Sequence, residues 1–132
     1  MLRLEIVTPE KRVLDAEVDS VTVPTASGEA GILPNHAPLV SALKPGVLAY
    51  SIKGTTDRIA VSGGFVEVNN DKVAVLVDTA ETADDIDAAV ARSDRESAEK
   101  TASAAGVLTA EEAEAAREGV DLADARLVVG GR

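Results

Sequence analysis

The 132-residue sequence predicts a β-sandwich followed by a C-terminal α-helical hairpin, an α+β chain with two segregated parts. Apolar and polar residues alternate with period two up to about residue 78, which is typical of strands buried on one face. At residues 79–85 the composition changes, and Val and Ile give way to Ala, Glu, Asp and Arg, which favour or tolerate helices. We therefore place the sandwich at residues 1–82 and the hairpin at residues 83–132.

The N-terminal part begins with Leu2, Leu4 and Ile6 alternating with charged residues, and the alternation returns at Val21 and Val23. Further β-rich runs lie at residues 47–52, 58–61, 65–68 and 72–77. Turn-forming residues separate them at 53–55, 63–64 and 69–71. Many short strands with frequent turns indicate a sandwich or a flattened barrel.

The C-terminal part contains the start and stop signals of two helices. Thr82 or Asp84 is the expected N-cap of the first helix, and residues 105–106, Ala-Gly, are expected to end it. Thr109 with Glu112 three residues later has the pattern of a capping box that opens the second helix. These signals predict two antiparallel helices.

One narrow apolar stripe runs along the expected second helix. Its members recur at three- and four-residue spacing and are Ala113, Ala116, Val120, Ala123 and Leu127. Because most of them are alanine, and because Gly119 interrupts them, the stripe buries little area. We expect the hairpin to dock reversibly.

Composition limits both the core and the partners. Only Tyr50 and Phe65 are aromatic, so Val, Ile, Leu and Ala must build the core. The absence of Cys excludes Cys-ligated metal sites, and no apolar run approaches the length of a membrane span, so we expect a soluble, cytoplasmic chain without lipid insertion.

Net charge argues against binding to nucleic acid or anionic lipid. The chain carries a formal charge of −10, whereas both ligands require basic patches. Residues 1–79 hold ten acidic and seven basic side chains, a net of −3, and residues 80–132 hold thirteen and six, a net of −7. The hairpin is therefore the more acidic part.

Catalytic motifs fail when they are tested one by one. Ser62 lacks the glycine two residues before it that a nucleophile elbow requires, and no glycine-rich loop ends in Lys-Ser or Lys-Thr. His36 is the only histidine, so one chain cannot supply a two-His metal site. We predict no catalytic residue, no metal site and no enzyme activity.

Two ordered blocks carry a resemblance to a known family. Residues 27–48 read SGEAGILPNHAPLVSALKPGVL, and residues 59–81 read IAVSGGFVEVNNDKVAVLVDTAE. Both are similar to the epsilon subunit of F-type ATP synthases, whose mitochondrial counterpart is called delta, and the similarity continues over residues 1–88. The resemblance implies a non-catalytic rotor subunit of the central stalk in a proton-translocating enzyme.

The resemblance also implies partners and a location. The sandwich would tie the gamma subunit to the membrane rotor c-ring, and the hairpin would reach the alpha and beta subunits and weakly inhibit ATP hydrolysis. The chain would lie peripherally on the cytoplasmic face of the bacterial inner membrane. An apolar patch should be exposed where gamma binds.

Five residues match partner-binding positions of the family. They are Thr8, Glu29, His36, Ser41 and Asp78. The family uses the matching His against gamma and the matching Glu, here in an expected exposed turn, against polar loops of the rotor ring. Without the resemblance, His36 is read as an ordinary loop histidine and Glu29 as a solvated carboxylate. Thr8, Ser41 and Asp78 are equally well read as ordinary strand-end polar residues.

A nucleotide site on the hairpin is implied only weakly. Its matching positions are Glu81, Ile86, Asp87 and Arg126. Val90 and Leu122 stand where ATP-binding members of the family have arginines. Each lost charge-assisted phosphate contact is worth roughly 1.5–3 kcal/mol, so we predict weak or absent ATP binding and no cofactor.

Two alternatives stay open from the sequence. One is a nucleotide-sensing regulatory subunit, which Asp87 and Arg126 favour. The other is a free-standing small-ligand-binding β-sandwich in which Pro34 to Pro38 frames a pocket, although few aromatic residues exist to line it.

Overall fold

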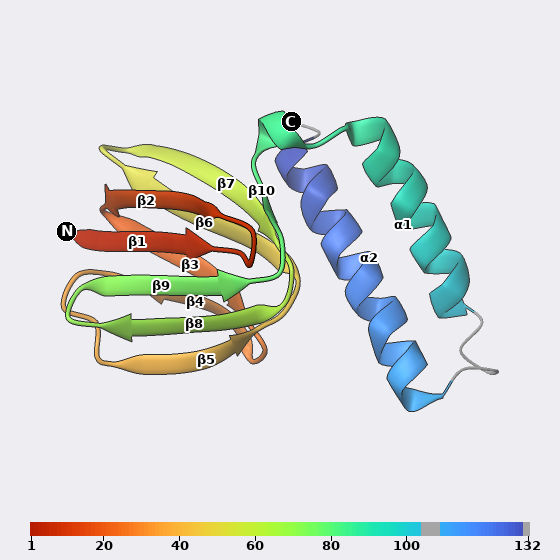
Figure 1. The fold of residues 1–132 in the computed structure, drawn as a ribbon, viewed down its shortest axis with the longest axis horizontal. Coiled ribbons are helices and arrows are strands. Elements are labelled where there is room, and N and C mark those ends of the chain that lie inside the picture. Colours follow the sequence, from red (N-terminus) through yellow and green to blue (C-terminus); the bar gives the residue numbers. More distant parts are fainter. Residues whose placement is uncertain (104–108, 131–132) are drawn as a thin grey trace.

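A ten-stranded sheet folded into two layers is followed by two helices in the computed structural model, which describes residues 1–103 and 109–130 (Figure 1). The predicted fold class, a β-sandwich followed by a helical hairpin, is confirmed. The strands are β1 (Leu2–Val7), β2 (Arg12–Val18), β3 (Ser20–Thr25), β4 (Gly28–Ile32), β5 (Leu39–Leu43), β6 (Gly46–Ile52), β7 (Thr55–Val61), β8 (Gly64–Asn69), β9 (Lys72–Val77) and β10 (Ala80–Glu81). The helical elements are the 3-10 turn η1 (Ala83–Asp85) and the helices α1 (Ala88–Ser103) and α2 (Ala110–Gly130).

The strand order explains the two layers. It runs β10-β7-β6-β3-β5-β8-β9-β1-β2, and β4 pairs with the side of β3. Only one residue pair, Thr25 with Leu43, joins β3 to β5, so the sheet folds over at this point. β1 runs parallel to β9, and the other strand pairs are antiparallel.

The core between the layers is aliphatic, as the composition predicts. Its buried cluster is Leu2, Leu4, Ile6, Val18, Val21, Val23, Ile32, Leu43, Leu48, Ile59, Val61, Val66, Val68, Val73, Val75 and Val77. The predicted inward positions of β1 and β3 belong to this cluster. Tyr50 packs at its edge and Phe65 lies outside it.

Two predicted turns have the backbone that tight hairpins need. Lys53 and Gly54 have φ values of 51° and 81°, and Asn70 and Asp71 have 50° and 60°. Two consecutive residues with positive φ match the twist of the strands they join. These turns connect β6 to β7 and β8 to β9.

Four strands were not anticipated, namely β2, β4, β5 and the short β10, which follows the point where the strand pattern was expected to end. The prediction that Glu29 lies in an exposed turn was wrong, because Glu29 is the second residue of β4 and pairs with Pro24 of β3. Its side chain is nevertheless exposed. Pairing with β3 forms β4 although its GEAGI sequence has low intrinsic strand preference.

The first long helix begins later than predicted. Thr82 precedes η1, where its N–H and hydroxyl both donate to Asp85 Oδ2 at 3.0 Å. Asp87 caps α1 instead, since its Oδ1 accepts the N–H groups of Ala89 at 2.9 Å and Val90 at 3.2 Å. The predicted stop at residues 105–106 lies outside the described residues.

The predicted cap of the second helix is confirmed. The Glu112 N–H donates to Thr109 Oγ1 at 3.1 Å, and the Thr109 hydroxyl donates to the Glu112 carboxylate at 3.1 Å. The first helical residue is Ala110.

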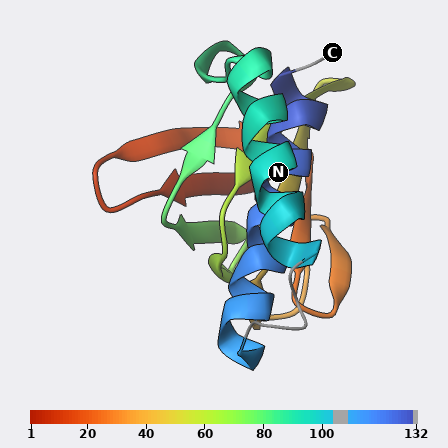
Figure 2. The same ribbon diagram turned by 90° about the vertical axis from the view of Figure 1, so that its right-hand side faces the viewer.

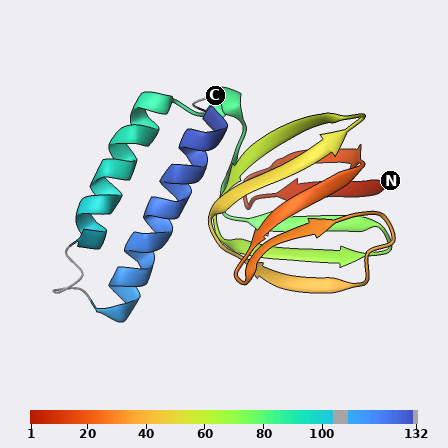
Figure 3. The ribbon, with the colours of Figure 1, turned by 180° about the vertical axis from the view of Figure 1, so that it is seen from behind.

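α2 lies between the sandwich and α1 (Figures 1 and 3), and α1 lies in front of α2 when the hairpin faces the viewer (Figure 2). Of the predicted stripe, Ala116 and Ala123 are buried and the other members are half-buried. A second buried pair, Ala125 and Val129, was missed and packs with Ala60 of the sandwich. α2 needs both apolar faces because it has a neighbour on each side. No helix in the described ranges is long and apolar enough to cross a membrane.

Candidate functional site

An apolar row crosses the outer surface of the layer that contains β5, β8, β9 and β1. The strand register aligns its members side by side, in the order Ala42, Phe65, Leu76 and Val7. Phe65 and Leu76 are 59% and 50% exposed, and Val40 in the next row is 73% exposed. We call the four aligned residues the outer apolar row.

The outer apolar row is unusual because the only Phe of the chain belongs to it. Phe65 precedes the buried Val66 on β8, so the alternation of the strand turns it away from the core. Neighbouring exposed apolar side chains on a sheet face mark interaction sites, and aromatic residues commonly anchor them. This surface is therefore suited to a protein partner.

Two predicted partner residues lie at one end of the outer apolar row. A depression of about 440 Å³ is lined by Val7, Thr8, Pro9, Gly63, Gly64, Phe65, Leu76, Val77 and Asp78. Thr8 also closes the turn after β1, since its N–H donates to the Lys11 carbonyl at 2.9 Å. The structure thus brings Thr8 and Asp78 together beside Phe65.

His36 lies elsewhere, in the loop between β4 and β5. It is half-buried, its Nδ1 lies 2.7 Å from the Ala37 carbonyl oxygen, and Pro34 and Pro38 around it are exposed. The neighbouring Asn35 N–H donates to Asp71 Oδ1 at 2.6 Å, which ties this loop to the β8–β9 turn.

Ser41 and Glu29 complete the predicted partner residues. Ser41 shares the inward side of β5 with buried Leu43, and its hydroxyl donates to the Ala42 carbonyl at 3.2 Å. Glu29 lines a shallow groove of about 270 Å³ that also includes Val128 of α2. Glu29 therefore lies at the hairpin end of β4, whereas His36 follows the other end.

The predicted nucleotide positions meet where the hairpin joins the sandwich. Arg126 of α2 lies between two carboxylates, with Nε 3.0 Å from Glu81 Oε1 and Nη1 2.9 Å from Asp94 Oδ2. The Nε contact is an ion pair without hydrogen-bond geometry. Ile86 is buried beside Ala91 and Val129, and Asp87 is used as the cap of α1. Of the four positions, Glu81 and Arg126 form an ion pair.

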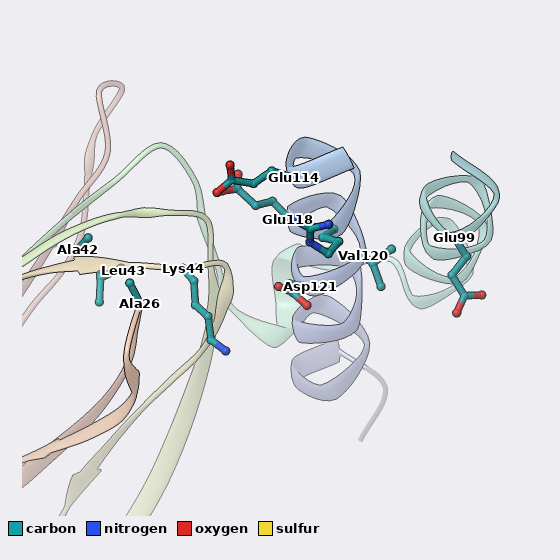
Figure 4. Close-up of a pocket in the computed structure, with 10 residues that line it drawn as sticks. Ala26, Ala42, Leu43, Lys44, Glu99, Glu114, Glu118, Val120 and Asp121 are labelled. Carbon is teal, nitrogen blue, oxygen red and sulfur yellow. The ribbon is translucent and has the colours of Figure 1, made fainter. Parts of the chain in front are cut away.

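A wide groove separates the rest of α2 from the sandwich (Figure 4). Its volume is about 960 Å³, and its lining residues are Ala26, Ala42, Leu43, Lys44, Glu99, Glu114, Arg117, Glu118, Val120 and Asp121. Carboxylates outnumber cationic groups in this lining, so the groove disfavours phosphate.

Several surface groups have perturbed electrostatics. The Thr82 N–H and hydroxyl lower the pKa of Asp85, and the hydrogen bond from Arg3 lowers the pKa of Asp15. Burial raises the pKa of Tyr50. Within residues 1–103 and 109–130, no cluster of His, Cys, Asp and Glu could hold a metal ion.

Two features of the candidate sites, the exposed Phe65 and the Asp94 partner of Arg126, were not identified from the sequence. The outward position of Phe65 was readable, because it shares a face with Glu67 in the alternating run 65–68. Asp94 could also have been identified from the sequence, because it lies seven residues after Asp87 and hence on the same side of the expected helix.

Comparisons with known proteins identify the family. Residues 1–83 match the family described as ATP synthase, Delta/Epsilon chain, beta-sandwich domain. The ATP synthase epsilon chain of Desulforamulus reducens is 52% identical over 104 residues, which cover 79% of each chain. The ATP synthase epsilon chain of Desulfitobacterium hafniense is 44% identical over 126 residues, which cover 96% of this chain and 86% of the relative.

Solved structures show the same fold. A chain in the Euglena gracilis mitochondrial ATP synthase has a TM-score of 0.78 at 24% identity, covering 93% of this chain and 77% of that one. A chain in the central stalk and c-ring structure of Tetrahymena thermophila ATP synthase has a TM-score of 0.64 at 16% identity, covering 98% and 96%.

Proposed function

The chain belongs to the delta/epsilon chain family of ATP synthase, and on that premise we propose that it is the non-catalytic rotor subunit of the central stalk. The sandwich couples the gamma subunit to the membrane rotor c-ring, so that rotation driven by proton flow reaches the catalytic head. The chain lies peripherally, on the cytoplasmic face of the bacterial inner membrane.

The observation that carries this proposal is the outer apolar row. A subunit clamped by gamma needs an exposed apolar face with an aromatic anchor, and Phe65 beside Leu76 supplies one. Thr8 and Asp78 lie at the polar edge of the same surface. We assign gamma to this surface, with the loop of His36 at its far end.

Binding to a recombinant gamma subunit tests the assignment. Phe65→Glu places a charge in the middle of the row and should weaken binding by roughly 30-fold or more, as expected for a central hot-spot residue. Val90→Glu is the matched control, because Val90 is also about half exposed but belongs to the hairpin. If the folded wild-type chain fails to bind gamma, the rotor assignment is wrong. If both variants bind equally well, gamma uses another surface.

Glu29 is proposed to face basic groups in the polar loops of the c-ring. An exposed ion pair of this kind contributes only about 0–1 kcal/mol, so it aligns the two surfaces more than it holds them together. Glu29→Gln should therefore weaken ring binding slightly and make it less sensitive to salt. A variant with an unchanged salt dependence would remove Glu29 from the contact.

We further propose that the hairpin binds ATP weakly or not at all. The support is that Arg126 already pairs with Glu81 and Asp94, so phosphate would have to displace carboxylates. Calorimetric titration of the full chain with ATP should show no saturation at micromolar concentrations. Tight binding would revive the alternative of a nucleotide-sensing subunit.

The hairpin is proposed to contact the alpha and beta subunits and to inhibit ATP hydrolysis only weakly. Residues 80–132, which include the hairpin, carry a net charge of −7, and this gives little attraction to acidic partner surfaces. Reconstituted enzyme with a chain ending at Thr82 should hydrolyse ATP at nearly the same rate as enzyme with the full chain. A large rise on truncation would contradict weak inhibition.

A further inference from the structure

Three elements meet at the guanidinium of Arg126. This side chain of α2 pairs with Glu81 of β10 and with Asp94 of α1, at 3.0 and 2.9 Å. The Arg126 side chain is only 17% exposed, although it is charged. We call these three residues the Arg126 triad. It is an ionic connection between the sandwich and both helices of the hairpin.

Apolar contact between hairpin and sandwich is small and lies near the same place. The buried cluster at this joint is Ala60, Ile86, Ala91, Ala125 and Val129, with Val47, Ala83 and Leu127 partly buried around it. Alanine buries little area, so such a cluster stabilises docking less than a leucine interface would.

The other end of α2 does not share this contact. The groove of about 960 Å³ lies between Lys44 of the sandwich and Glu114, Glu118 and Asp121 of α2 (Figure 4). Packing of the hairpin on the sandwich is therefore concentrated at the C-terminal end of α2. Contacts at this end of α2 therefore decide whether the whole hairpin stays against the sandwich.

We infer that the Arg126 triad is a latch that holds the hairpin against the sandwich without any bound ligand. Docking then depends on ionic strength, because salt screens partly exposed ion pairs. Loss of either the guanidinium or the Glu81 carboxylate releases the hairpin. The inference concerns docking within one chain and does not depend on the binding of gamma or the c-ring.

Arg95 provides a matched control for Arg126. It pairs with Glu99 of α1 at 2.8 Å and with Asp124 of α2, so both of its partners belong to the hairpin. Arg95→Gln removes the same charge and two ion pairs but leaves the connection to β10 intact. A latch predicts different effects of Arg95→Gln and Arg126→Gln on docking.

The experiment is single-molecule energy transfer between two dyes on the full chain. The chain has no Cys, so Thr55→Cys on β7 and Glu96→Cys on α1 create unique labelling positions, both at exposed residues. The wild type should be mainly docked at low salt, and the detached fraction should rise as salt increases. Arg126→Gln should weaken docking by up to about fivefold at low salt, the effect expected of the one partly exposed pair, Arg126 with Glu81, that joins the hairpin to the sandwich.

Two further variants make the result decisive. Glu81→Gln leaves both helices unchanged and should also detach the hairpin. The exchange of Arg126→Glu with Glu81→Arg restores opposite charges and should recover part of the docking. Docking that is insensitive to salt, to Glu81→Gln, or equally sensitive to Arg95→Gln and Arg126→Gln would overturn the latch. Circular dichroism checks that each variant keeps its helices.

Discussion

The sandwich and the hairpin hold their parts together in different ways. The sandwich encloses large aliphatic side chains between two layers, and Leu2, Leu4 and Ile6 have no exposed surface. The joint under the hairpin is built largely of alanine, and the charged side chain of Arg126, only 17% exposed, lies beside it. A buried Leu contributes about 1.5–3 kcal/mol and a methyl group much less. The sandwich core therefore supplies most of the free energy of folding, whereas the contacts at the joint decide where the hairpin lies.

The largest expected effect is in the sandwich core. Leu4→Ala should lower the free energy of unfolding by about 3 kcal/mol, because it removes buried methyl groups and leaves a cavity. Denaturant titration measures the change. Val90→Ala, at an exposed hairpin position, should cost less than about 0.5 kcal/mol. Equal losses of unfolding free energy in the two variants would contradict the different roles of the sandwich core and the hairpin surface.

Gly64 of the sandwich has no room for a larger side chain. A Cβ at this position would press against the Leu76 carbonyl oxygen on the adjacent strand β9, and a backbone atom has little room to move. Gly64→Ala should lower the free energy of unfolding by about 2 kcal/mol, in the range of overpacked cores. Thermal unfolding tests this, and a neutral substitution would show that β8 and β9 can separate.

Gly119 of the hairpin has room for a methyl group, so its substitution should change stability in the opposite direction. A Cβ here would lie 3.6 Å from the Ala98 Cβ of α1, an ordinary contact. Gly119→Ala should stabilise α2 by up to about 1 kcal/mol, because glycine is a poor helix former. Hydrogen exchange should slow at α2 amides and stay unchanged in the sandwich. Faster exchange in α2 would contradict the prediction.

The smallest effect concerns the turn between the two parts. The Thr82 N–H and hydroxyl lower the pKa of Asp85 in the folded chain. The stabilisation of η1 is therefore complete above the unfolded carboxyl pKa of about 3.9 and is lost as the pH falls through the lower folded value. The Thr82 amide resonance should shift in that acidic range. Asp85→Asn should abolish the shift, and a wild-type resonance that stays constant would refute it.

Much of the sandwich was predictable because its strands alternate clearly. The inward residues of β1 and β3, the runs later found in β6 to β9, and two turns with positive φ were all read from local patterns. β4 was not predicted, because Gly28, Glu29 and Gly31 are poor strand formers. Its pairing with β3, a tertiary effect, overrides that preference.

The hairpin was predictable in type but not in detail. The first helix was expected to begin after Thr82 or Asp84, but Ile86 is extended and buried in the joint, so α1 starts only after Asp87. The apolar stripe of α2 was found, whereas Ala125 and Val129 were missed because only the sandwich makes that face necessary. The Arg126 triad joins residues 45 and 32 positions apart, and local patterns do not report such distances.

The parallel pairing of β1 with β9 has a consequence for how the chain is made. β1 precedes the other strands along the chain, but its parallel neighbour β9 is complete only at Val77. The layer that contains β5, β8, β9 and β1 therefore cannot close until most of the sandwich has left the ribosome. The hairpin follows the sandwich along the chain, so it emerges when the surface on which it docks is already able to fold. Folding therefore has an order set by the sequence, in which the sandwich can form before the hairpin docks on it.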